Sequence, residues 1–141
     1  MPRAHPVTRS EAEWRALLTP EQFRMLRQGG AERPDTSALV HERRQGTFHC
    51  LGCESALFEG RMKFDSGTGW PSFSAPIPGA IQTVADDSYM GGLHSGYGAV
   101  VPEVICAACG SHLGHLFNDG PAPTGLRYCI NGVGLRFAPA G

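Results

Sequence analysis

Two Cys-X-X-Cys pairs constrain this chain more than any other feature of its sequence. Cys50 and Cys53 form the first pair, and Cys106 and Cys109 form the second. Each pair places two thiols on one tight turn, and four thiolates together suit a Zn²⁺ ion in a closed, structural site. Because the segment 54–105 separates the pairs, such an ion would join two distant hairpins. Iron in the same cage, or two redox disulfides, would fit this spacing as well.

A fifth cysteine, Cys129, stands alone near the C-terminus in the segment LRYCIN. An odd number of cysteines without a secretion signal favours a metal site plus a reactive thiol over a disulfide framework. Side chains alternate along a strand, so Arg127, Cys129 and Asn131 would share one face. A nearby guanidinium favours the thiolate, which is the nucleophilic form. The alternative is an inert buried cysteine, but a purely structural face would be apolar at these positions.

Further polar and aromatic residues follow the second cysteine pair and precede Cys129. The run HLGHLFND contains His112, His115 and Asp119, which could supply protons to a reaction. Alternatively, the histidines are ordinary loop residues or extra metal ligands; four cysteines suffice for zinc, so we leave both outside the metal site. Trp70, in the segment GWPSF, is either a core residue or the wall of a pocket for a methyl group.

Composition and charge narrow the classes of function. The 12 basic residues are scattered and the formal net charge is −1, which argues against a nucleic-acid partner. No apolar run approaches the roughly 18 residues of a membrane span, so no membrane partner is expected. The opening MPRAHPVTRS lacks the apolar centre of a signal peptide. We therefore expect a cytoplasmic protein.

The pattern predicts a mainly antiparallel β (α+β) fold in a single domain over residues 1–141. A helical segment covers about residues 10–30, with helix starts at Ser10 and Thr19, each followed three residues later by Glu or Gln in a capping box. The zinc-clipped β core covers about 47–138, and its Gly-rich segment 86–99 is expected to be a loop. Five β-type runs are predicted: 47–50, 62–64, 79–85, 100–105 and 126–137.

Three motifs in colinear order give the chain a family resemblance. They are KFDSGTGWPSF at 63–73, HLGH-X-F-X-DGP at 112–121 and RYCIN at 127–131. Together with the two cysteine pairs, they resemble the B-type peptide methionine-R-sulfoxide reductases over roughly residues 10–138. The resemblance implies a β-tent-like pair of small antiparallel sheets, short N-terminal helices and one structural zinc ion per chain. It also implies reduction of methionine-R-sulfoxide, free or in proteins, to methionine.

The resemblance carries residue roles with it. Trp70 would receive the substrate methyl group, and Phe117 would join it in substrate binding. Six residues would form the catalytic group: Cys129 as the nucleophile, with His112, His115, Asp119, Arg127 and Asn131 around it. The expected substrates are oxidised proteins or peptides, and the protein is expected to act as a monomer.

One departure from the family pattern bears on the catalytic cycle. Thr68 stands where many relatives carry a cysteine that resolves the sulfenic acid as a disulfide. We therefore predict a cycle with a single cysteine, in which a thioredoxin-like or small-thiol reductant regenerates Cys129. The alternative function is a non-catalytic, zinc-stabilised β-tent that binds a ligand; such a module would not need Arg127, Cys129 and Asn131 in register.

Overall fold

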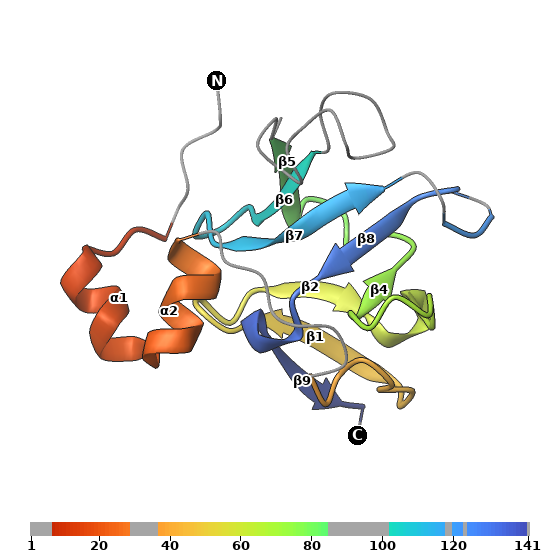
Figure 1. Cartoon of the computed structure of the whole chain (residues 1–141), viewed down its shortest axis with the longest axis horizontal. Helices are drawn as coiled ribbons and strands as arrows, with labels where there is room; N and C mark the ends of the chain where they lie inside the picture. Colours follow the sequence, from red (N-terminus) through yellow and green to blue (C-terminus); the bar gives the residue numbers. More distant parts are fainter. Residues whose placement is uncertain (1–6, 29–36, 85–101, 118–119, 123, 141) are drawn as a thin grey trace.

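The structure, a computed structural model, describes residues 7–28, 37–84, 102–117, 120–122 and 124–140 (Figure 1). Two short helices precede two antiparallel sheets. The predicted mainly antiparallel β fold with N-terminal helices is therefore confirmed. The predicted loop 86–99 and Asp119 lie outside the described residues.

The two helices begin where the sequence predicts. Helix α1 covers Glu11–Leu17 and helix α2 covers Pro20–Arg27. In α1, the Glu13 backbone N–H donates to Ser10 Oγ at 3.2 Å, and the Ser10 N–H donates to the Glu13 carboxylate at 2.7 Å. Thr19 forms the equivalent capping box at the start of α2. Each box satisfies backbone donors that have no partner within the helix, which fixes the first helical residue.

The strands form one sheet of three and one of six. The smaller sheet has the order β2-β1-β9. Its strands are β1 Gly46–Cys50, β2 Ala56–Glu59 and β9 Leu135–Pro139. The larger sheet has the order β3-β4-β8-β7-β6-β5. Its strands are β3 Lys63–Phe64, β4 Ser72–Phe73, β5 Ile81–Val84, β6 Glu103–Cys106, β7 His112–Phe117 and β8 Arg127–Ile130.

The sequence predicts one β-type run over 126–137, but the structure has two strands there. The run is split into β8 and β9, which lie in different sheets, by a short 3-10 turn at Gly132–Gly134. The chain passes close to its neighbours at this turn. A Cβ atom on Gly132 would collide with the Ser37 side chain, and one on Gly134 would lie 2.9 Å from Leu26 Cδ2. The two glycines therefore allow the crossing between sheets.

The core lies between the two sheets. Phe48 of β1 and Phe58 of β2 come from the smaller sheet and Phe73 of β4 comes from the larger one, and all three are fully buried. The Phe58 and Phe73 rings stack with centroids 4.2 Å apart, and Phe48 meets Phe73 edge-on at 5.0 Å. Such pairs contribute about 0.5–1.5 kcal/mol each beyond their burial. These contacts fix the position of β4, which pairs with the strand that carries Cys129.

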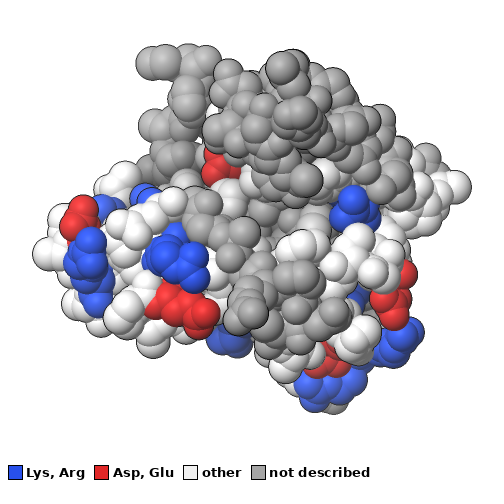
Figure 2. Space-filling view, viewed as in Figure 1, with Lys and Arg blue, Asp and Glu red and all other residues white. Residues whose placement is uncertain are grey.

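The helices cover the end of the molecule at which the β1–β2 and β6–β7 turns lie (Figure 1). The Arg27 guanidinium of α2 donates to the Cys109 carbonyl at 2.9 Å and stacks 4.3 Å from the Trp14 ring of α1. Basic and acidic side chains lie side by side on the face shown in Figure 2. No helix among the described residues is both long and apolar enough to cross a membrane.

Candidate active site and metal centre

Cys129 lies on β8, between β4 and β7 of the larger sheet (Figure 1). It is directly opposite Ser72 on β4 and directly opposite His115 on β7. Residues directly opposite each other in an antiparallel sheet project from the same face. Ser72 is fully buried, whereas Cys129 is half-buried. The lone thiol therefore has a hydroxyl and an imidazole as its two cross-strand neighbours.

A β-bulge brings the second predicted histidine to the same region. Val104 of β6 lies opposite Gly114, but Ile105 lies opposite His112, so Leu113 is an extra residue in β7. In a regular strand, side chains three residues apart point to opposite faces. The bulge removes this offset. The His112 and His115 rings consequently meet edge-on, with centroids 5.4 Å apart.

An acidic residue completes this arrangement. Glu103 of β6 lies opposite His115 in the ladder, and its carboxylate contacts the His112 ring, with Oε2 2.5 Å from Nδ1. The His112 side chain is 8% exposed and that of Glu103 is 26% exposed, so this pair is largely shielded from water. Neither Glu103 nor Ser72 is among the residues that the motifs assign to the reaction. Alternation within β6 gives no sign of this contact, because it depends on the bulge in β7.

The neighbours of Cys129 along its own strand are also held in place. Arg127 lies opposite Phe117 of β7, and its guanidinium is 4.4 Å from the Phe117 ring centroid. Asn131, just beyond β8, is 6% exposed, and its backbone N–H donates to the Leu113 carbonyl at 2.8 Å. The structure therefore places Arg127 and Asn131 on either side of Cys129, both buried.

Trp70 approaches the site from the loop between β3 and β4. Its backbone carbonyl accepts a hydrogen bond from Ser72 Oγ at 3.2 Å, and Ser72 is the cross-strand neighbour of Cys129. Thr68, in the same loop, is linked to Ser72 through Ser66 by two hydroxyl contacts of 2.8 Å. The indole is half-buried. The structure thus brings Trp70 next to β4 and β8, and β8 is the strand that carries Cys129.

The close approach of β7 to β8 requires a glycine between the two histidines. A Cβ atom on Gly114 would collide with the Cys129 backbone carbonyl. The β-type runs predicted from the sequence do not include this segment, because its central glycine interrupts the pattern. In the structure, the same glycine allows the His115 strand to pair closely with the Cys129 strand.

The four other cysteines gather at the turns of two hairpins. Cys50 and Cys53 flank the β1–β2 turn, and Cys106 and Cys109 flank the β6–β7 turn, so the group joins the two sheets. All four sulfurs lie within 4.8 Å of one another. The Sγ atoms of Cys50 and Cys109 are 3.8 Å apart, and those of Cys53 and Cys106 are 3.6 Å apart. Four thiolates around one tetrahedral zinc ion would be about 3.8 Å apart, so the group fits such an ion.

Protons are shared within this sulfur group. A hydrogen bond with Cys106 is the main cause that lowers the pKa of the Cys109 thiol, and one with Cys50 lowers the pKa of Cys53. The pKa of Cys50 is raised, chiefly by its hydrogen bond with Cys106. Metal binding requires all four ligands as thiolates, and a cation between the sulfurs would replace the shared protons. Neither His112 nor His115 belongs to this group.

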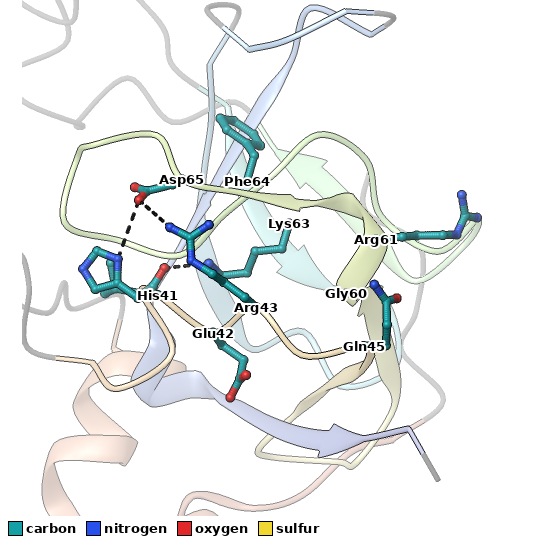
Figure 3. Close-up of a pocket in the computed structure, with 10 residues that line it drawn as sticks. His41, Glu42, Arg43, Gln45, Gly60, Arg61, Lys63, Phe64 and Asp65 are labelled. Atoms are coloured by element: carbon teal, nitrogen blue, oxygen red, sulfur yellow. Dashed lines mark hydrogen bonds and ion pairs between the residues drawn. The ribbon is translucent and has the colours of Figure 1, made fainter.

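A separate pocket of about 270 Å³ lies between the segments 40–45 and 60–65 (Figure 3). Its acidic and basic groups are largely paired with each other. Asp65 is 3.3 Å from the Arg43 guanidinium and 3.7 Å from the His41 ring, and Lys63 Nζ donates to the Val40 carbonyl at 2.6 Å. None of the residues that the motifs assign to the reaction lines this pocket. This pocket is therefore separate from the candidate site at Cys129.

Comparison with known proteins decides the family. The model of the SelR domain matches residues 18–139. This chain belongs to the SelR family. A relative from Pseudomonas putida (strain W619), named peptide methionine sulfoxide reductase MsrB, is 48% identical over 133 residues, which cover 94% of this chain and 95% of that protein.

Two further SelR relatives carry the same name. The protein of Synechococcus sp. (strain RCC307) is 50% identical over 133 residues, covering 94% of this chain and 92% of its own length. That of Methanosarcina barkeri (strain Fusaro / DSM 804) is 47% identical over 131 residues, covering 93% and 87%. The resemblance indicated by the motifs is confirmed, and the non-catalytic binding module is not favoured.

Proposed function

We propose that this protein reduces methionine-R-sulfoxide, free or in peptides and proteins, to methionine, with Cys129 as the nucleophile. The observation that carries the proposal is the position of Cys129 opposite His115 in the β7–β8 ladder. Of the five cysteines, it is the one outside the metal-binding group. A reactive thiol beside an imidazole is the arrangement that nucleophilic sulfur chemistry needs.

The reaction transfers one oxygen atom and two electrons. A sulfoxide sulfur is a poor electrophile until its oxygen is protonated or hydrogen-bonded. The Cys129 thiolate attacks this sulfur and forms a sulfur–sulfur bond. The oxygen takes up a proton and its bond to the substrate sulfur breaks; as this oxygen passes to the Cys129 sulfur, the sulfur–sulfur bond breaks and Cys129 is left as a sulfenic acid. The substrate sulfur is reduced to the thioether of methionine, and the cysteine is oxidised. The step therefore needs a thiolate, a proton donor at the oxygen and a pocket for the methyl group.

The surrounding side chains supply these three requirements. His115 gives the proton to the sulfoxide oxygen, and His112 and Asp119 assist it. Arg127, anchored on Phe117, favours the thiolate form of Cys129 by its positive charge. Trp70 and Phe117 form apolar walls that bind the substrate. Asn131, at the end of β8, orders the surroundings of the substrate.

The metal is Zn²⁺, one ion per chain, in a structural role. Four cysteine sulfurs close a tetrahedral site and leave no position for substrate. The support is the spacing of the sulfurs, all within 4.8 Å of one another. By joining the β1–β2 hairpin to the β6–β7 hairpin, the ion would hold the start of β7, the strand that contains His112 and His115.

The rest of the proposal concerns the setting of the enzyme. The chain acts as one domain over residues 1–141, because the helices and both sheets contribute to one core cluster. It works in the cytoplasm as a monomer on oxidised proteins and peptides. A thioredoxin-like or small-thiol reductant regenerates Cys129, since Thr68 stands where many relatives would have a resolving cysteine.

The proposed function predicts a stoichiometric single turnover. Without a reductant, the protein should convert one methionine-R-sulfoxide per chain and leave the S epimer unreacted. Intact mass and a sulfenic-acid probe should show one oxygen on Cys129, with the metal retained. Loss of two thiols to an internal disulfide would contradict the one-cysteine cycle. Thr68→Cys is the contrasting variant, because the hydroxyl chain from Thr68 ends beside Cys129; this variant should lose two thiols.

The proposed acid predicts a slower reductive step in His115→Ala. General acid catalysis is typically worth about 10²–10⁴-fold, so the single-turnover rate should fall within that range. The matched control is His41→Ala, which removes an exposed ring in the separate pocket and should leave the rate unchanged. Rapid-quench measurement of methionine formation checks both. A wild-type rate in His115→Ala would mean that His112, Asp119 or water is the acid.

A further inference from the structure

The contact between Glu103 and His112 has no part in the roles assigned above. Glu103 reaches across from β6 to β7, and its Oε2 lies 2.5 Å from His112 Nδ1. A carboxylate accepts hydrogen bonds, so Nδ1 carries the proton and donates it. The hydrogen on Nδ1 leaves Nε2 as the acceptor nitrogen of the neutral ring. A carboxylate at one ring nitrogen is a general way to fix both the tautomer and the orientation of a functional histidine.

The contact between Glu103 and His112 belongs to a row of side chains that crosses three strands. Glu103 lies opposite His115, His115 lies opposite Cys129, and the bulge at Leu113 places His112 on the side of His115. The two imidazole rings are 5.4 Å apart between centroids and tilted by 66°. A carboxylate, two imidazoles and the thiol therefore follow one another across β6, β7 and β8. If the Glu103–His112 pair served only to join β6 to β7, the His112 ring would not need to lie beside His115, the proposed acid.

We propose that Glu103 is a positioning residue for the reductive step, holding His112 as its Nδ1–H tautomer and fixing its ring beside His115. This inference rests on the proposed function of Cys129 and His115. Glu103 acts through His112 and does not touch the substrate. Its carboxylate sets which nitrogen of His112 can accept a hydrogen bond within the site, and so orders the proton donors around the sulfoxide oxygen.

The test combines a spectroscopic measurement with a double-mutant cycle. Nitrogen NMR of the imidazole rings should show His112 as the Nδ1–H tautomer in the wild-type protein and as a mixture of tautomers in Glu103→Gln. The single-turnover rate of Glu103→Gln should fall by about 10–100-fold, the range found when the carboxylate that orients a metal-bound histidine is removed. Glu103→Asp keeps the charge but is one methylene shorter, so it should recover only part of the rate. Glu59→Gln, an exposed acid on β2, is the matched control and should keep the full rate.

The cycle separates positioning from a purely structural role. If Glu103 acts through His112, Glu103→Gln should cause no further loss in a His112→Ala background. A full additional loss there, an unchanged rate in Glu103→Gln, or an Nε2–H tautomer in the wild type would each overturn the inference while leaving the proposed function intact. A wild-type protein that does not reduce methionine-R-sulfoxide would instead overturn the proposed function, and the inference with it.

Discussion

Replacing Cys129 with Ser is expected to abolish turnover while leaving the fold and the metal site in place. A hydroxyl is a far weaker nucleophile than a thiolate at neutral pH, and the four other cysteines belong to the metal-binding group. Loss of an enzymatic nucleophile costs at least about 10⁴-fold in rate, because the remaining groups can only polarise and position the substrate. Steady-state reduction of a methionine-R-sulfoxide peptide with dithiothreitol measures the loss.

The fold of Cys129→Ser should survive because the change is small and the site is half-buried. Such substitutions usually cost about 0.5–3 kcal/mol, which leaves a folded domain. Thermal unfolding and elemental analysis of the variant should therefore resemble those of the wild type. Alkylation of the wild-type protein provides an independent check, since one iodoacetamide adduct on Cys129 should remove activity with the metal still bound. Turnover that survives in Cys129→Ser would eliminate the nucleophile on which the proposed mechanism rests.

The local signals in the sequence were sufficient to predict the helices and the cysteine cluster. Ser10 and Thr19 act within three residues of themselves, so their capping boxes are visible in the sequence and appear unchanged in the structure. Metal ligands at Cys-X-X-Cys spacing are similarly local within each pair. The joining of the two pairs followed from chemistry, because four thiols suit one ion better than two thiols do.

The strands were predicted less completely because short strands depend on their partners. The β-type pattern does not predict strands β2, β4 and β7. Strand β4 has only two residues, Ser72–Phe73, and is a strand because β3 and β8 pair with it on either side. Strand β7 contains Gly114, which weakens the β-type pattern although close contact with Cys129 requires it. Tertiary packing decides such elements, and no window of sequence contains it.

The motifs supply candidate members of the site but not its geometry, and they omit Glu103 and Ser72. The motifs named Cys129, His115 and Arg127 because they lie in recognisable runs. The contact of Glu103 with His112 depends on a bulge that shifts the β6–β7 register by one residue. A one-residue change of register reverses the face on which a side chain lies. Sequence periodicity therefore assigns His112 to the wrong side of the strand relative to His115, and only the paired strands correct it.

Replacing Cys106 with Ser is expected to destabilise the whole domain, the opposite pattern to that of Cys129→Ser. Cys106 is fully buried at the end of β6. Together with the three other cysteines of the group, it brings a hairpin turn of one sheet against a hairpin turn of the other. Structural zinc sites contribute about 10–16 kcal/mol of apparent binding free energy, whereas a domain has only about 5–15 kcal/mol of net stability. Loss of one ligand should therefore cost more than about 4 kcal/mol and release the metal.

Two measurements on one pair of variants test this expectation. Elemental analysis should find one zinc ion per chain in the wild type and in Cys129→Ser, and little metal in Cys106→Ser. Thermal unfolding should show a cooperative transition in the first two and a lowered or absent transition in the third. Because both variants exchange one sulfur for one oxygen, the contrast isolates the position of the cysteine from the chemistry of the substitution. If Cys106→Ser unfolded at the wild-type temperature, or if purified protein carried mainly iron, the sulfurs would not form a structural zinc site. The sheets would then be joined by the phenylalanine core between them, without the help of a metal.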